Sequence, residues 1–125
     1  MKITTHKELE VYKLSFDVAM KIFQLAKKFP QKETYSLTDQ ILRSSRSVSA
    51  NIAEAFRARK YEKSFVSKLV IAQCEAAESQ TWLDFALSCN YIENNLHMAL
   101  YDKYDHIIAM IVNMIKSPEK WCFGG

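Results

Sequence analysis

Residues 65–86 read FVSKLVIAQCEAAESQTWLDFA, and this stretch decides the fold. Apolar and small residues recur along it at alternating spacings of four and three: Phe65, Leu69, Ala72, Ala76, Ser79, Leu83 and Ala86. Such spacing draws one stripe along a helix, and its average of about 3.5 residues is the heptad repeat of helices packed at a shallow angle. The centre of the stripe is small, so a neighbouring backbone is expected to approach closely there.

A second helical pattern lies at the start of the chain. Thr5 and Glu8 have the spacing of a capping box, in which each side chain satisfies a free N–H of the first turn. Pro30 ends the pattern, because the residue before a proline is pushed out of helical geometry. The expected buried stripe of this segment is Leu9, Tyr12, Phe16, Ala19, Phe23 and Ala26.

Two further segments complete the set. One begins near Ser36, a suitable N-cap, and its expected stripe is Leu37, Ile41, Ser45, Val48, Ile52 and Ala55. The other follows Asn94 or Asn95 and ends at Ser117 and Pro118. Its apolar residues are Leu96, Leu100, Tyr104, Ile107, Ile111, Met114 and Ile115. The stretch 65–86 and its continuation carry a second apolar row, Trp82, Phe85 and Cys89.

These patterns predict an all-α protein, a single domain over residues 1–125 that forms an antiparallel up-and-down four-helix bundle. The expected helices span 6–29, 36–57, 60–90 and 94–116, and a frayed tail covers 117–125. With two Gly and two Pro, the chain lacks the tight turns that a strand-rich fold needs. The turn between the second and third helices is expected anywhere from 56 to 62, since Arg57–Lys60 contains no breaker.

Several classes of protein are disfavoured. No apolar run approaches the roughly 18 residues of a membrane span, and the N-terminus has no secretory signal, so we expect a cytoplasmic protein without membrane contact. Three cysteines without CxxC spacing indicate neither a disulfide framework nor a zinc site. His97 and His106 lie four residues after Glu93 and Asp102, which is not the Glu-x-x-His spacing of helical metal sites. We therefore predict no metal, no cofactor and no catalytic residue.

Positive charge collects in the middle of the chain. Residues 43–68 carry seven basic side chains against two acidic ones, although the whole chain has a net charge of only +3. The seven are Arg43, Arg46, Arg57, Arg59, Lys60, Lys63 and Lys68. They are either a solvated face with cations near a helix C-terminus or a site for the phosphates of RNA or DNA.

Other side chains have two interpretations each. Asn51, Glu54 and Glu78 lie beside the expected core stripes, where polar groups usually serve as hydrogen-bond partners at helix or subunit seams. Acid–base chemistry by the two carboxylates would require a cleft and a partner base. The remaining apolar residues either widen the core or form a subunit interface, where aromatic residues are enriched: Phe56, Trp82, Phe85 and Ile108.

Residues 29–55 closely resemble the four-helix bundle family of 23S rRNA intervening-sequence proteins, whose pattern runs roughly FPxxExYxLxxQxxRAxxSxxxNIAEG. The matching positions are Phe29, Pro30, Glu33, Tyr35, Leu37, Gln40, Arg43, Ser47, Asn51, Ile52, Ala53 and Glu54. Leu9–Tyr12 resembles the opening LxVW segment of the family. The sequence differs from the family pattern at Tyr12, at Ala55 and at Gln73–Glu75.

The resemblance implies an up-and-down bundle that assembles as a homopentamer and has no catalytic activity. The family includes proteins encoded within insertions in large-subunit ribosomal RNA genes. It also includes accessory proteins of diversity-generating retroelements, which bind nucleic acid and a reverse transcriptase. We accordingly expect a non-enzymatic homo-oligomer that contacts RNA or DNA through the seven basic residues of the stretch 43–68, which we call the basic corner. The alternative is a scaffold or adaptor whose partner is another protein.

Overall fold

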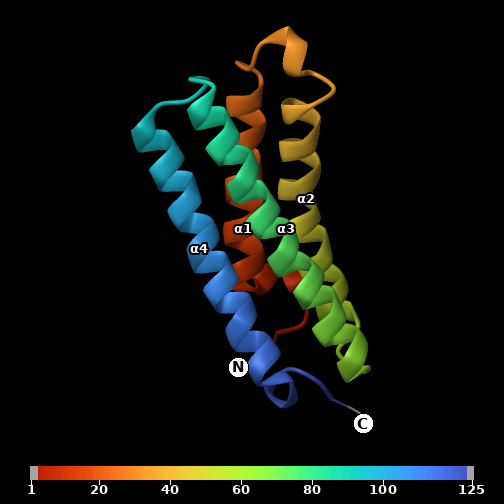
Figure 1. Cartoon of the computed structure of the whole chain (residues 1–125). Coiled ribbons are helices and arrows are strands. Elements are labelled where there is room, and N and C mark those ends of the chain that lie inside the picture. The colour runs from red at the N-terminus through yellow and green to blue at the C-terminus, as the bar shows by residue number, and fades with distance from the viewer. Residues whose placement is uncertain (1–2, 124–125) are drawn as a thin grey trace.

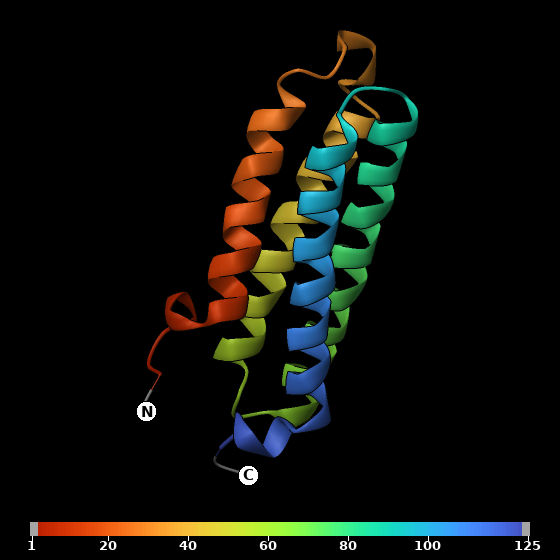
Figure 2. The same ribbon diagram turned by 90° about the vertical axis from the view of Figure 1, so that its left-hand side faces the viewer.

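Four long helices run side by side and alternate in direction, as the computed structural model of the chain shows for residues 3–123 (Figure 1). They are α1 (Glu10–Ala26), α2 (Leu37–Arg57), α3 (Glu62–Ser88) and α4 (Asn94–Lys116). Three short 3₁₀ helices flank them: η1 (His6–Glu8), η2 (Gln31–Glu33) and η3 (Pro118–Lys120). The predicted all-α four-helix bundle is confirmed. Seen from the side, α1 and α4 stand at the front with α2 and α3 behind them (Figure 2).

The heptad on α3 forms the centre of the core. All seven residues of its stripe are fully buried, and so are five of the six predicted for α2, with Leu37 only 6% exposed. Both stripes are confirmed. The small residues at the centre of α3 let α2 approach closely. The hydrogen bond between the Ser44 and Ser79 hydroxyls, which lie 2.8 Å apart, shows this approach.

The stripe predicted for the first helix is confirmed at Leu9, Ala19 and Ala26, which are buried, and wrong at its three aromatic residues. Phe16 is 49% exposed, and Tyr12 and Phe23 are only partly buried. The buried face of α1 also includes Val11, Ser15, Val18, Ile22 and Leu25, which were not predicted. Both rows have helical spacing, so periodicity alone does not choose between them. The buried row fits because Ser15 is small and its hydroxyl bonds to Ser49 of α2 at 2.9 Å.

The boundaries of the first helix also differ from the prediction. The capping box of Thr5 and Glu8 forms, but it caps η1. Leu9 then adopts an extended conformation, and α1 begins at Glu10. At the far end α1 stops at Ala26, and Phe29 turns back into the core, where it is 8% exposed.

The connection from α3 to α4 has a defined cap. Asn90 adopts a left-handed conformation with φ of 62°. The N–H of Tyr91 donates to Ala86 O at 2.8 Å and that of Asn90 to Leu87 O at 3.0 Å. This pair of bonds is the Schellman motif, in which asparagine tolerates the left-handed position better than most residues. It explains why α3 ends at Ser88.

The C-terminal tail is not frayed where the structure describes it, contrary to the prediction. Residues 118–120 form η3, and Trp121 and Cys122 pack partly buried against the core. The N–H of Phe123 donates to Arg59 O at 3.3 Å, which ties the tail to the α2–α3 connection. Residues 124–125 of the predicted tail lie outside the described part of the chain.

The additional apolar residues divide between core and surface. Phe56 is 3% exposed and belongs to the core, while Trp82 and Ile108 are partly buried against it. Phe85 is 53% exposed, and Leu96 of the predicted α4 stripe is also exposed. Among residues 3–123, no helix has an apolar stretch long enough to cross a membrane.

Replacement of Ala76 by leucine tests the close packing at the centre of α3. Ala76 is fully buried, so the added methylenes force side-chain and backbone shifts. We expect Ala76→Leu to lower the free energy of unfolding by about 1–3 kcal/mol in urea denaturation. Ala109→Leu, at an exposed position of α4, is the matched control. Equal stability of the two variants would contradict the packing described.

Candidate nucleic-acid interface

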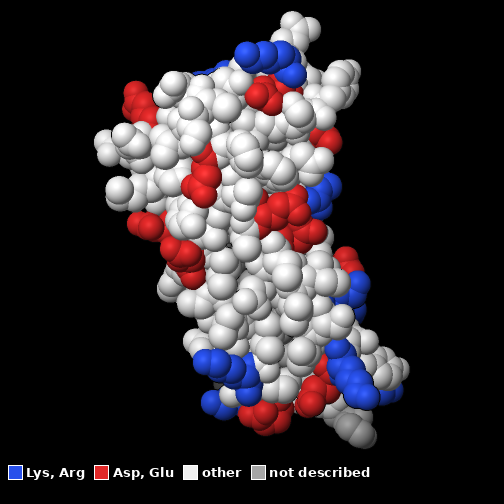
Figure 3. All heavy atoms as spheres, in the orientation of Figure 1, with Lys and Arg blue, Asp and Glu red and all other residues white. Residues whose placement is uncertain are grey.

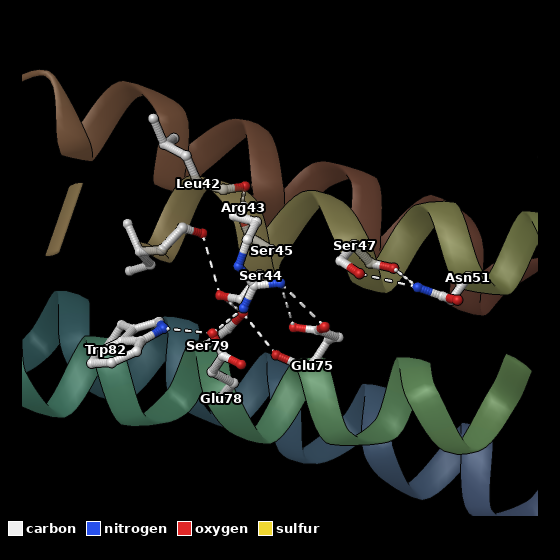
Figure 4. Close-up of polar contacts among 11 residues, drawn as sticks. Leu42, Arg43, Ser44, Ser45, Ser47, Asn51, Glu75, Glu78, Ser79 and Trp82 are labelled. Carbon is white, nitrogen blue, oxygen red and sulfur yellow. Dashed lines mark hydrogen bonds and ion pairs between the residues drawn. The ribbon is translucent and has the colours of Figure 1, made fainter. Parts of the chain in front are cut away.

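Arg43, the first residue of the predicted basic corner, is held at the surface of the bundle by contacts between α2 and α3. Its guanidinium projects from α2 towards α3, where Nη1 lies 3.2 Å from the Glu75 carboxylate and Nη2 pairs with Glu78 (Figure 4). These carboxylates, Glu75 foremost, raise the pKa of Arg43. Glu78 also accepts a hydrogen bond from Trp82 Nε1 at 3.0 Å. Arg43 therefore meets protein carboxylates rather than an external anion.

The other polar residues singled out from the sequence lie along α2 and its seam with α3. Glu54 forms an ion pair with Lys68 across the seam, with a distance of 2.8 Å. Asn51 is 9% exposed, and its amide donates to Ser47 O and Ser47 Oγ one turn earlier (Figure 4). Five surface pockets of the described residues are lined by neither Glu54 nor Glu78.

Four of the seven basic residues remain together at one end of the bundle. Arg57, Arg59, Lys60 and Lys63 surround the connection between α2 and α3. Within residues 3–123, no ion pair joins any of the four to a carboxylate. The Arg59 guanidinium lies 3.6 Å from the Phe56 ring centroid and 5.0 Å from that of Phe123, and its Nε donates to Phe56 O. We call these four residues the basic end.

The structure separates Arg46 from this group and adds lysines to it. Arg46 faces α1, with its guanidinium 5.8 Å from the Phe23 ring. Lys116 and Lys120 lie at the same end of the molecule as the basic end, since α4 finishes there and η3 packs against α3. Blue side chains accordingly gather at the lower end of the molecule, with red ones among them (Figure 3). Lys116 and Lys120 are far from residues 43–68 in the sequence. Only the helical periodicity of α4, which predicts where that helix ends, could have indicated that they lie near the basic end.

At the opposite end, Glu33 joins two connections that are remote in sequence. It accepts hydrogen bonds from Ser36 Oγ at 2.7 Å, from the N–H of Leu37 and from Tyr91 Oη at 2.8 Å. The Ser36 hydroxyl and then Tyr91 lower the pKa of Glu33 below its ordinary value of 4.5. The same bond raises the pKa of Tyr91 to about 12. Glu33 thereby occupies the start of α2 and links it to the α3–α4 connection.

The described residues bring no three metal-ligating side chains of His, Cys, Asp or Glu together. Cys74, Cys89 and Cys122 are all free thiols. His97 contacts Asp84 at 2.7 Å across the α3–α4 seam, so one of the histidines considered for metal binding serves a helix contact.

Comparison with known proteins identifies relatives over most of the chain. The family described as 23S rRNA-intervening sequence protein matches residues 7–113. A solved structure from Bacteroides thetaiotaomicron VPI-5482, a protein of unknown function from the S23 ribosomal protein family, is 31% identical. The match covers 85% of this chain and 95% of that one, with a TM-score of 0.77. No curated protein matches the chain.

Removal of the Arg43 side chain tests the ion pairs between α2 and α3. We expect Arg43→Ala to lower the free energy of unfolding by about 1 kcal/mol, because the pairs are partly exposed and screened by water. The loss should shrink in high salt. Arg57→Ala removes an exposed cation without a described partner and serves as the control in the same urea titrations. Equal effects of the two substitutions would argue against the contact.

The hydrogen bonds of Glu33 predict a loss of stability in acid. A carboxyl whose pKa is lowered by folding stabilises the native state above its unfolded pKa, and this contribution disappears as the pH falls through its folded pKa. We expect the unfolding free energies of the wild type and Glu33→Gln to differ at pH 7 and to converge below about pH 4. Glu93→Gln, at an exposed position, should run parallel to the wild type. Parallel curves for Glu33→Gln would refute the assignment.

Proposed function

The chain belongs to the 23S rRNA-intervening sequence protein family, and on that premise we propose that it is a non-enzymatic, homo-oligomeric binding protein. Its ligand is RNA or DNA, and its contact surface is the basic end. We assign no metal, cofactor or catalytic residue to it. The cytoplasm is the proposed compartment, in keeping with the three free cysteines.

The uncompensated charge of the basic end carries this proposal. Arg43 and Lys68 already face carboxylates of the same chain, so binding a phosphate through them would first break those pairs. Arg57, Lys60 and Lys63 are exposed and have no such contact within residues 3–123. Arg59 is held by two aromatic rings, which suits the planar guanidinium and limits its freedom before binding. Of the seven residues in the predicted basic corner, only the four of the basic end thus remain as proposed phosphate contacts.

A few cations on one bundle bind phosphate weakly, and repetition compensates for this. Each copy in a homo-oligomer presents the same end, so several contacts to one nucleic acid strengthen each other through effective concentration. The resemblance to the family implies five copies. With subunits arranged in parallel around a ring, their basic ends would lie on one side of the assembly.

A protein-only scaffold is the second candidate, and the exposed apolar side chains of α3 favour it. Val70 and Phe85 are 42% and 53% exposed, which suits a protein partner better than a phosphate backbone. Binding to nucleic acid separates the two candidates.

Titration of the full-length protein with structured RNA over a salt series tests the proposal. We expect binding that weakens as salt rises, since each neutralised phosphate releases counterions. The combined variant Arg57→Ala, Lys60→Ala, Lys63→Ala should bind more weakly and reduce the slope of log K against log salt by about 2.

The control removes the same charge from the other end of the bundle. Lys27→Ala, Lys28→Ala, Lys32→Ala alters three exposed lysines around the end of α1 and η2, and its salt slope should match that of the wild type. Absence of RNA and DNA binding at low salt, or an equal loss in both triple variants, would exclude the basic end and favour the scaffold.

A further inference from the structure

Two exposed aromatic side chains stand among the cations of the basic end. Tyr61 precedes the first residue of α3, lies between Lys60 and Lys63 in the chain, and is 63% exposed. Phe123 follows η3 in the C-terminal tail and is 58% exposed. Figure 2 shows this tail, in blue, beside the α2–α3 connection at one end of the bundle. Aromatic and cationic side chains therefore share this end of the molecule.

Each of the two rings lies next to a cation of the basic end. The Arg59 guanidinium is 5.0 Å from the ring centroid of Phe123. Lys60 Nζ is 5.9 Å from the ring centroid of Tyr61. Because Arg59 and Lys60 are consecutive, with Cα atoms about 3.8 Å apart, the two rings flank one short segment of the connection. A nucleic-acid strand with its phosphates on these cations would have its bases within reach of the rings.

Backbone hydrogen bonds hold both rings in place. The N–H of Tyr61 donates to Ala58 O at 2.8 Å, and Tyr61 O accepts from the N–H of Phe65 at 2.9 Å, in the first turn of α3. The N–H of Phe123 donates to Arg59 O at 3.3 Å. An exposed ring on an anchored backbone has little conformational freedom to lose when another flat group stacks on it, which favours binding.

The net charge at this end is moderate. Glu62 at the start of α3 and Glu119 in η3 lie there together with six basic residues. The six are Arg57, Arg59, Lys60, Lys63, Lys116 and Lys120. Phosphate contacts with so few cations are weak and fall off steeply with salt. Stacking of a base on an aromatic ring adds affinity without further charge, and it tolerates any sequence because every base has a flat π-face.

We propose that the basic end binds single-stranded nucleic acid, with unpaired bases stacked on Tyr61 and Phe123 and phosphates on the surrounding cations. A duplex offers its phosphates but not its bases, because their faces are covered by neighbouring base pairs and exposing them costs unstacking energy. This inference rests on the proposed nucleic-acid function and names the form of nucleic acid that the site accepts. Single-stranded RNA and DNA share the recognised groups, so both are tested.

Binding of the full-length protein to oligonucleotides of equal length is the first measurement. Oligouridine and oligothymidine are each compared with the duplex that they form with an oligoadenine complement, and we expect the single strands to bind more tightly. The tighter of the two single strands identifies the preferred sugar. An abasic DNA of the same length keeps the phosphates and lacks the bases. It should bind at least about fivefold more weakly than oligothymidine, which is the lower end of the contribution of one stacked base.

Substitution of Tyr61 tests the stacking directly. We expect Tyr61→Ala to weaken oligothymidine binding by at least about fivefold. The slope of log K against log salt should stay the same, because no phosphate contact is removed. Tyr61→Phe retains the ring and should bind like the wild type. The matched control is Tyr35→Ala, which removes a tyrosine that is 93% exposed near the start of α2, at the opposite end of the bundle. It should leave the affinity unchanged.

The outcomes separate this inference from the proposed function. Duplexes that bind as tightly as single strands, an abasic strand that binds like oligothymidine, or equal affinities of Tyr61→Ala and Tyr35→Ala would overturn stacking at the basic end. Each of these results would leave its phosphate contacts in place. Absence of binding to every oligonucleotide at low salt would instead refute the proposed function, and this inference with it.

Discussion

Close packing between α2 and α3 is the constraint on which the rest of the structure depends. Ala72, Ala76 and Ser79 are fully buried at the centre of α3, and their size lets the Ser44 hydroxyl of α2 reach Ser79 at 2.8 Å. A well-packed core tolerates neither voids nor added atoms. The distance between these helices in turn places Arg43 within reach of Glu75 and Glu78.

The same packing determines which basic side chains form ion pairs within the chain. Side chains along the seam meet carboxylates, as Arg43 and Lys68 do, whereas those at the connection form no ion pair within residues 3–123. Three of the four seams contain a polar contact: Ser15–Ser49, Ser44–Ser79 and Gln80–Asp105. The α1–α4 seam has none among residues 3–123, and grooves lined by residues of both helices run along it. This seam is the least constrained part of the fold.

The candidate site was only partly accessible from the sequence. Clustering of basic residues between 43 and 68 was visible, but the partners of Arg43 lie 32 and 35 residues away. Proximity in sequence therefore overestimated the number of cations that remain uncompensated. Lys116 and Lys120 were missed for the converse reason, since antiparallel helices bring distant segments to the same end.

The sequence by itself determined the four helices, their antiparallel order and the buried faces of α2 and α3. On α3 the sequence indicates one buried face, because only the heptad stripe from Phe65 to Ala86 repeats at spacings of three and four without a break. Tertiary structure alone decided the buried face of α1, where the row of Val18 and the row of Phe16 have equal periodicity. Burial there depends on the shape of the surface opposite, where the Ser15 hydroxyl bonds to Ser49 of α2 at 2.9 Å.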